Sequence, residues 1–130
     1  MVDFLKNPLV QYVPIRVSNS SEGFWQNPLY NDSEIFVYKD LEDLSATLSQ
    51  LRLPQINPLP EDNLAIVALN FKAERIYYRF LTVKLIGQKK KDYYHIFSIT
   101  NKYFPKRIRL LHFTLFTQAG EKLAWKNIKI

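Results

Sequence analysis

The sequence predicts an α+β fold: an antiparallel β-meander of five or more strands with one amphipathic helix packed on it. Apolar residues make up 47% of the 130 residues and aromatic residues 15%, which is typical of a packed globular protein. From residue 63 onward, strand-like apolar runs alternate with short polar breaks. The leucines between residues 41 and 51 recur at helical spacing. The length fits one domain over residues 1–130.

The N-terminal third predicts only short elements. Residues 9–13 and 15–17 are strand-like, but Pro14 between them cannot donate to a ladder, so we expect an edge or broken strand. The serine-rich residues 18–23 predict a loop. We expect Phe24 and Trp25 to pack as a lid over one end of the core, followed by a short strand at 35–38.

A helix is predicted over about residues 40–52. Asp40 is a suitable N-cap, and Asp43 stands three residues later as in a capping box. One helical face carries four leucines, and Pro54 ends the segment. They are Leu41, Leu44, Leu48 and Leu51. An amphipathic helix of this length packs one face on a sheet.

The C-terminal half predicts the sheet. The expected strands are residues 64–71, 76–86, 93–100, 107–117 and 123–130. The expected loops between them are residues 72–75, 87–91, 101–105 and 118–121. Connections this short join antiparallel neighbours, because a parallel crossover needs a dozen or more residues. The meander could curl into a half-barrel.

Charge is distributed unevenly along the chain. Residues 72–109 carry eleven basic and two acidic side chains, whereas residues 1–71 carry four basic and nine acidic ones. Such a segment attracts acidic partners, and it could equally be the solvated side of a sheet. We interpret this segment as a contact surface for a macromolecular partner, in the first place another protein. Its candidate residues are Arg75, Arg79, Lys89, Lys90, Lys91, Tyr94, Tyr103, Lys106, Arg107 and Arg109.

Residue types that support catalysis are scarce. The chain has no cysteine, two histidines and three glycines, so it lacks thiolate zinc sites, thiol nucleophiles and phosphate-cradling glycine loops. His95 and His112 each sit within a strand-like run, and as a facing pair they could bind a metal only weakly. We expect a protein that is not an enzyme, with no catalytic residues, no cofactor and no metal.

An alternative function is single-stranded nucleic-acid (RNA) binding by a basic, tyrosine-rich sheet face. Aromatic rings stack on bases while lysine and arginine bind phosphates. The candidate rings are Tyr77, Tyr78, Tyr93, Tyr94, Tyr103 and Phe104. Adjacent tyrosines in a strand point to opposite faces, so half of them belong to the core. No RNP-type motif is present.

A family resemblance also bears on the partner. The succession FVYKDLEDLSATLSQLRLP, EDNLAIVALNF and RFLTVKLIG, over about residues 36–100, resembles the small PrcB-like accessory domain of secreted bacterial protease complexes. That resemblance implies a protein-binding accessory domain without catalytic residues, and it also implies export.

The sequence shows neither a signal peptide nor an apolar run long enough to span a membrane. The cytoplasm is therefore the default expectation, and a trimmed leader would leave export open. An exposed sheet edge could pair two copies, so the oligomeric state also stays open.

Overall fold

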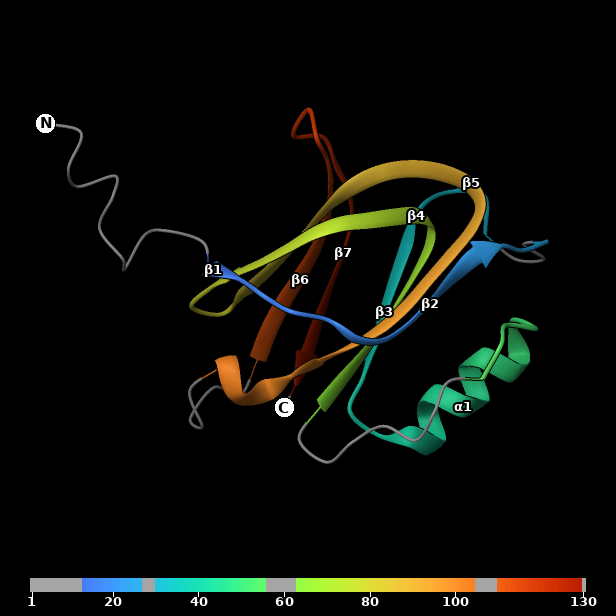
Figure 1. Cartoon of the computed structure of the whole chain (residues 1–130), viewed down its shortest axis with the longest axis horizontal. Coiled ribbons are helices and arrows are strands. Elements are labelled where there is room, and N and C mark those ends of the chain that lie inside the picture. The colour runs from blue at the N-terminus through green and yellow to red at the C-terminus, as the bar shows by residue number, and fades with distance from the viewer. Residues whose placement is uncertain (1–12, 27–29, 56–62, 105–109, 130) are drawn as a thin grey trace, which may run out of the picture.

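The computed structural model describes residues 13–26, 30–55, 63–104 and 110–129. This part of the chain forms one mixed sheet and one α-helix (Figure 1). The elements in order are β1 (Val13–Pro14), β2 (Ser18–Phe24), β3 (Glu34–Tyr38), α1 (Leu41–Gln50), β4 (Asn63–Arg79), β5 (Thr82–Thr100), the 3-10 helix η2 (Asn101–Tyr103), β6 (Leu110–Thr117) and β7 (Lys122–Lys129). The α+β class is confirmed.

The sheet is organised by two long, bent strands. β4 and β5 pair antiparallel from Asn63↔Thr100 to Arg79↔Thr82, and the chain reverses at residues 80–81. The predicted loops at 72–75 and 87–91 are therefore wrong, because both segments lie inside strands. Their polar residues accompany register shifts in the β4–β5 ladder, where a bulge bends the strand and exposes side chains without ending it.

The sheet is mixed, so the purely antiparallel meander is also wrong. Its main order is β1-β4-β5-β6-β7, with β2 added to β5 and β3 added to β4. β6 runs parallel to the first part of β5, from Thr82↔His112 to Gly87↔Thr117. The chain between β5 and β6, which includes η2, returns to the start of β5, and this return makes the pairing parallel.

The N-terminal elements differ from the prediction in two respects. Residues 15–17 are not in a strand, and of the predicted strand 9–13 only Val13 lies among the described residues. Residues 18–23 form most of strand β2, which pairs with β5 from Ser18↔Ser98 to Phe24↔Tyr93, so the predicted loop is wrong. Polar residues suit an edge strand because one side of the ladder faces water. Pro14 lies in a two-residue strand paired with Tyr77.

Helix α1 forms as predicted. The Asp40 side chain accepts a hydrogen bond from the Glu42 N–H (2.9 Å) and caps the first turn. Leu44 and Leu48 are fully buried, whereas Leu41 is exposed. Trp25 is buried and donates from Nε1 to the Leu51 carbonyl (2.8 Å), so it packs as predicted, but Phe24 stays 72% exposed.

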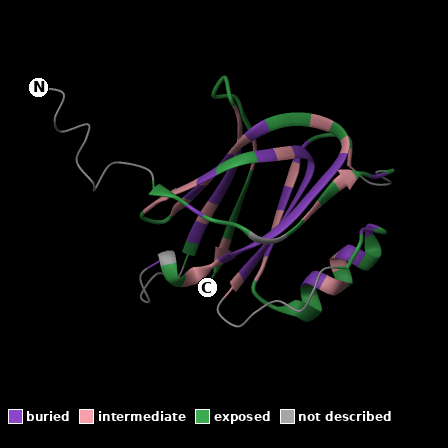
Figure 2. Cartoon of the chain, viewed as in Figure 1, coloured by how far each residue is buried: buried purple, intermediate pink, exposed green. Residues whose placement is uncertain are grey.

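Two apolar clusters form the core (Figure 2). One lies inside the bent sheet and includes Ile66, Leu85, Phe97 and Phe113. The other joins Leu44 and Leu48 of α1 to the opposite face of β4 and β5. The face covered by α1 belongs to the β2–β3 half of the sheet. Among the helices described here, none is long and apolar enough to cross a membrane.

Candidate functional site

The half of the sheet formed by β4, β5, β6 and β7 has one face outside the core. Residues paired directly across strands share a face, and Ile76, Leu85 and Phe113 point into the core cluster. Their neighbours in sequence therefore lie on the opposite side, here called the outer face. It consists of Arg75, Tyr77, Arg79, Thr82, Lys84, Ile86, Leu110, His112, Thr114, Phe116, Lys122, Trp125, Asn127 and Lys129.

The cross-strand register places these residues in rows. One row runs Arg79, Thr82, His112, Asn127, and a second runs Tyr77, Lys84, Thr114, Trp125. A third row contains Arg75, Ile86, Phe116 and Lys122. Aromatic and basic side chains therefore share one side of four adjacent strands.

Rings and cations on the outer face are in contact. The Lys84 ammonium lies 4.6 Å from the centroid of the Phe116 ring. The Lys122 ammonium lies 6.0 Å from the Trp125 ring, which also packs beside His112 with the centroids 5.7 Å apart. Trp125 is 57% exposed. Phe116 and Trp125 therefore each have a cation within the range of cation–π attraction.

Acidic side chains lie at the rim of the outer face. Glu74 bonds the side chains of Gln88 and Gln118 beside Arg75. A hollow of about 320 Å³ opens there, lined by Glu74, Arg75, Ile86 and Gln118. At the β7 edge, a second hollow of about 480 Å³ contains Asp32, Glu34 and Glu121 together with Lys89 and Lys122.

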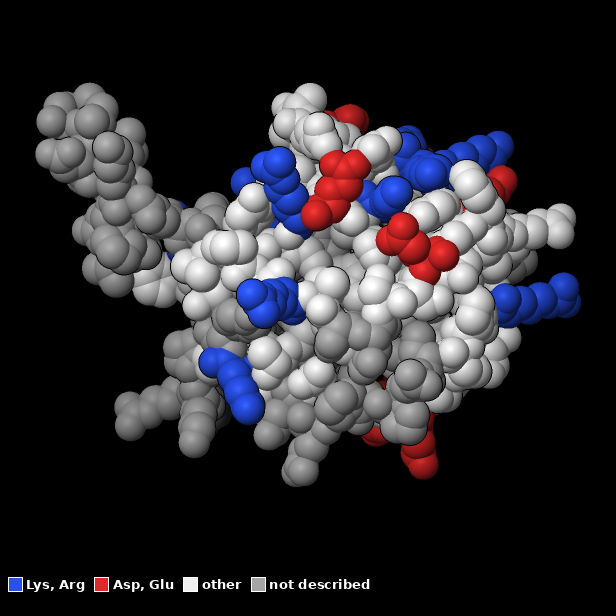
Figure 3. All heavy atoms as spheres, in the orientation of Figure 1, with Lys and Arg blue, Asp and Glu red and all other residues white. Residues whose placement is uncertain are grey.

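The predicted contact residues do not form one surface. Arg75 and Arg79 lie on the outer face, whereas Lys89, Lys90 and Lys91 lie at the bend of β5. The Lys90 ammonium sits over the rings of Phe24 (4.8 Å) and Tyr93 (4.4 Å). Figure 3 shows Lys and Arg spread over the visible face, with Asp and Glu between some of them.

Tyr94 was predicted to contact a partner. It is instead buried in the cluster under α1 and offers no surface for one. Its neighbour in sequence, Tyr93, is buried as well. Lys106, Arg107 and Arg109 lie outside the described residues, as does the side chain of Tyr103.

Sequence reasoning missed several residues of the outer face. The candidates did not include Phe116, Trp125, Lys84 and Lys122. Alternation along a strand shows which residues of that strand lie on the same side of the sheet. The missing information was the parallel register of β5 with β6, which places β6 and β7 beside Arg79 and Lys84.

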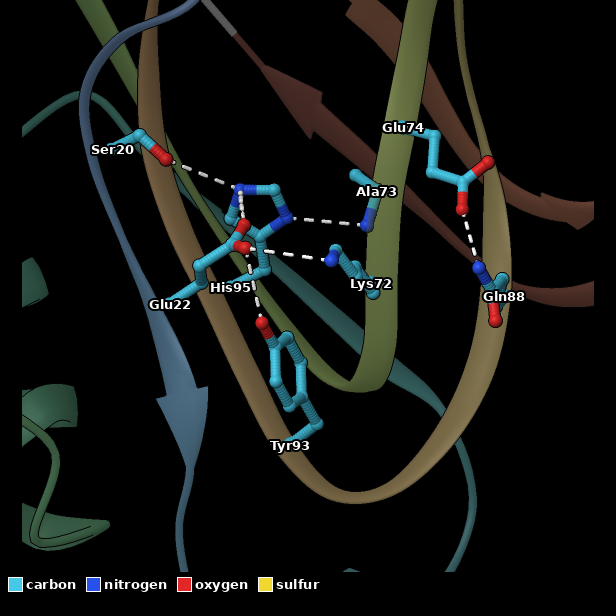
Figure 4. Close-up of polar contacts among 8 residues, drawn as sticks. All are labelled: Ser20, Glu22, Lys72, Ala73, Glu74, Gln88, Tyr93 and His95. Carbon is cyan, nitrogen blue, oxygen red and sulfur yellow. Dashed lines mark hydrogen bonds and ion pairs between the residues drawn. The ribbon is translucent and has the colours of Figure 1, made fainter.

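A second candidate is a polar cluster where β2 runs beside β5, next to the bend of β4 and β5 (Figure 4). Glu22 accepts a hydrogen bond from the Tyr93 hydroxyl (3.0 Å), and its carboxylate lies 3.0 Å from His95 Nε2 and 3.8 Å from the Lys72 ammonium. Burial raises the pKa of the Tyr93 phenol, and its hydrogen bond to Glu22 raises it further. The cluster therefore holds a neutral phenol against a carboxylate.

The hydrogen bonds of His95 fix its tautomer. Nδ1 accepts the Ala73 N–H (3.1 Å), so in the neutral ring the proton is on Nε2, near Glu22 and Ser20 Oγ (3.2 Å). Burial lowers the pKa of the imidazole; Glu22 opposes this effect, and Lys72 adds to it. A nitrogen that already carries a proton cannot take one from Ser20.

The cluster borders a cavity of about 320 Å³. Its wall contains His95, Ala73 and Arg75 together with apolar residues of the β1 edge such as Ile15 and Ile76. His95 and His112 do not face each other, since they pair with Ala68 and Thr82 respectively. Within the described ranges, no group of three His, Cys, Asp or Glu residues could hold a metal ion.

Comparison of the chain with protein-family models, with curated proteins and with solved structures gave no match. The resemblance to the PrcB-like domain therefore stays a prediction.

Proposed function

We propose that this protein is a non-catalytic binding module that docks an anionic macromolecular partner on its outer face. The observation that carries this proposal is the cross-strand register, which gathers five cations on one side of four adjacent strands. They are Arg75, Arg79, Lys84, Lys122 and Lys129. The outer-face residues defined above by the β4–β5, β5–β6 and β6–β7 ladders include no acidic residue. A patch of one sign of charge attracts partners of the opposite sign.

The geometry of the polar cluster gives no support to a catalytic role. Ser20 and Glu22 both approach the same nitrogen of His95, while a backbone N–H occupies the other. A nucleophile–histidine–acid relay needs the nucleophile and the acid on opposite nitrogens. The cluster instead ties β2 to the bend of β4 and β5, which is a structural role.

The test compares two double charge reversals of equal size. Arg79→Glu with Lys129→Glu alters the outer face, and Lys39→Glu with Lys102→Glu alters exposed lysines that lie outside it. We expect the first pair to weaken binding of a heparin oligosaccharide, used as a polyanion probe, by about tenfold in calorimetric titration. If both double variants lose the same affinity for heparin, the site is not localised on the outer face, and binding depends only on the net charge of the chain.

A further inference from the structure

The outer face combines its cations with three aromatic side chains that the core does not use. Tyr77, Phe116 and Trp125 come from β4, β6 and β7, and none of them is buried. Strands lie about 4.8 Å apart, so Tyr77 and Trp125 stand roughly 14 Å apart across three strand spacings. An acidic protein surface or an anionic lipid headgroup would need the cations but would gain little from flat rings at this separation.

The contacts between cations and rings suggest how a base and its phosphate would be held. The Lys84 ammonium lies over the Phe116 ring at 4.6 Å. A base that stacks on Phe116 brings its phosphate close to this ammonium. Lys122 stands in the same relation to Trp125 at 6.0 Å. Rings for bases beside cations for phosphates are how sheets hold single strands.

Duplex binding fits the described residues less well. In a duplex the base faces are stacked inside and cannot reach side-chain rings. A helix entering the major groove is the usual alternative, but α1 packs against the other half of the sheet, has Glu42 and Asp43 in its first turn and has no basic residue in its last turn.

We infer that the outer face binds single-stranded nucleic acid, with bases stacked on Tyr77, Phe116 and Trp125 and phosphates paired with the neighbouring lysines and arginines. This inference rests on the proposed function and specifies its partner. Sheets of this kind stack about two or three bases. The affinity depends on salt: with a slope of about −0.7 per neutralised phosphate, five cations limit the slope of log K against log salt to about −3.5.

The experiment is a titration of labelled single-stranded RNA, single-stranded DNA and duplex DNA of about ten nucleotides, followed by anisotropy at two salt concentrations. We expect both single strands to bind at least tenfold more tightly than the duplex. Trp125→Ala and Tyr77→Ala should each weaken single-strand binding by about tenfold or more. Bound single strands should also quench the fluorescence of exposed Trp125 but not that of buried Trp25.

Phe24→Ala is the matched control, because Phe24 is a 72% exposed ring on β2, outside this face. Its affinity should equal that of the wild-type protein, and thermal unfolding should confirm that every variant is folded. If the aromatic variants bind as the wild type does while the Arg79→Glu and Lys129→Glu variant loses heparin binding, the nucleic-acid inference fails and the proposed function stands. If neither oligonucleotides nor heparin bind the wild-type protein, both fail.

Discussion

At the scale of single residues, His95 is the group whose protonation bears most directly on stability. Its Nδ1 accepts the Ala73 N–H, and its Nε2 donates toward Glu22. A proton added at Nδ1 would confront the Ala73 N–H, so one hydrogen bond between β4 and β5 would be lost. The folded protein therefore favours the neutral ring, in agreement with the direction in which burial moves the pKa of His95.

The lowered pKa predicts acid sensitivity. The unfolded chain binds a proton at the ordinary histidine pKa of about 6.5, whereas folded His95 does not until a lower pH. The free energy of unfolding should therefore fall as pH decreases through this range. His95→Asn places a non-titrating acceptor near the Ala73 N–H. It should cost about 1–2 kcal/mol at neutral pH and should flatten the pH dependence of urea unfolding between about pH 7.5 and 5.5.

The second histidine supplies the control for this prediction. His112 lies on the outer face, with Nδ1 2.6 Å from Asn127 Oδ1. The same substitution there, His112→Asn, shows whether a flattened pH dependence is specific to His95 or follows the loss of either histidine. An unchanged slope in the His95→Asn variant would show that other groups cause the acid sensitivity.

At the scale of elements, the β4–β5 hairpin shows why sequence patterns misplaced the turn. The reversal occurs at Phe80 and Leu81, residue types that do not favour turns, and Phe80 adopts a left-handed conformation (φ 54°). Gly87, which suggested a loop, serves a different purpose. A Cβ atom there would lie 1.9 Å from the Lys72 carbonyl oxygen, so glycine permits close approach of two strands. Alternation of apolar residues cannot distinguish a glycine in a turn from a glycine that allows two strands to approach closely.

The strained turn predicts a stabilising substitution. Phe80 is 61% exposed, so replacing it removes little packing. Asparagine tolerates the left-handed conformation better than most residues. Phe80→Asn should raise the free energy of unfolding by about 0.5–1 kcal/mol in urea denaturation. Phe80→Ala keeps the unfavourable backbone and should not raise the free energy of unfolding. If both variants are stabilised equally, the cause is the removal of exposed apolar surface and not the backbone conformation.

At the scale of the whole molecule, local patterns predicted the α+β class, helix α1 and the burial of Trp25, but not the order and direction of the strands in the open, mixed sheet. The parallel pairing of β5 with β6 joins residues 30 positions apart, as in Thr82↔His112, and no local signal marks it. That pairing places Arg79 and Lys84 beside β6 and β7, whereas the lysines at 89–91 lie at the bend of β5, beyond the residues paired with β6. The basic segment was visible in the sequence, but its division between two surfaces was not.

The two halves of the sheet are joined through β4 and β5, and Asn70 lies at their bend. It adopts a left-handed conformation (φ 55°) and is 1% exposed. Its side chain donates to the carbonyls of Tyr30 (3.1 Å) and Asp32 (2.8 Å) and accepts the Asp92 N–H (2.9 Å). One side chain thus links β4, the bend of β5 and the segment that leads into β3.

We therefore expect the whole domain to unfold as one unit and Asn70 to stabilise both halves. Trp25 reports on the helix-covered half and Trp125 on the outer face.

Asn70→Ala removes three hydrogen bonds worth about 1 kcal/mol each and keeps a strained backbone, so it should cost roughly 3–4 kcal/mol. Asn70→Gly relieves the strain and should recover about 1 kcal/mol of that loss. The measurement follows urea unfolding by fluorescence in two single-tryptophan backgrounds, Trp25→Phe and Trp125→Phe. Asn70→Ala should lower the urea midpoint by the same amount in both backgrounds. A shift seen by only one tryptophan would mean that the two halves unfold separately.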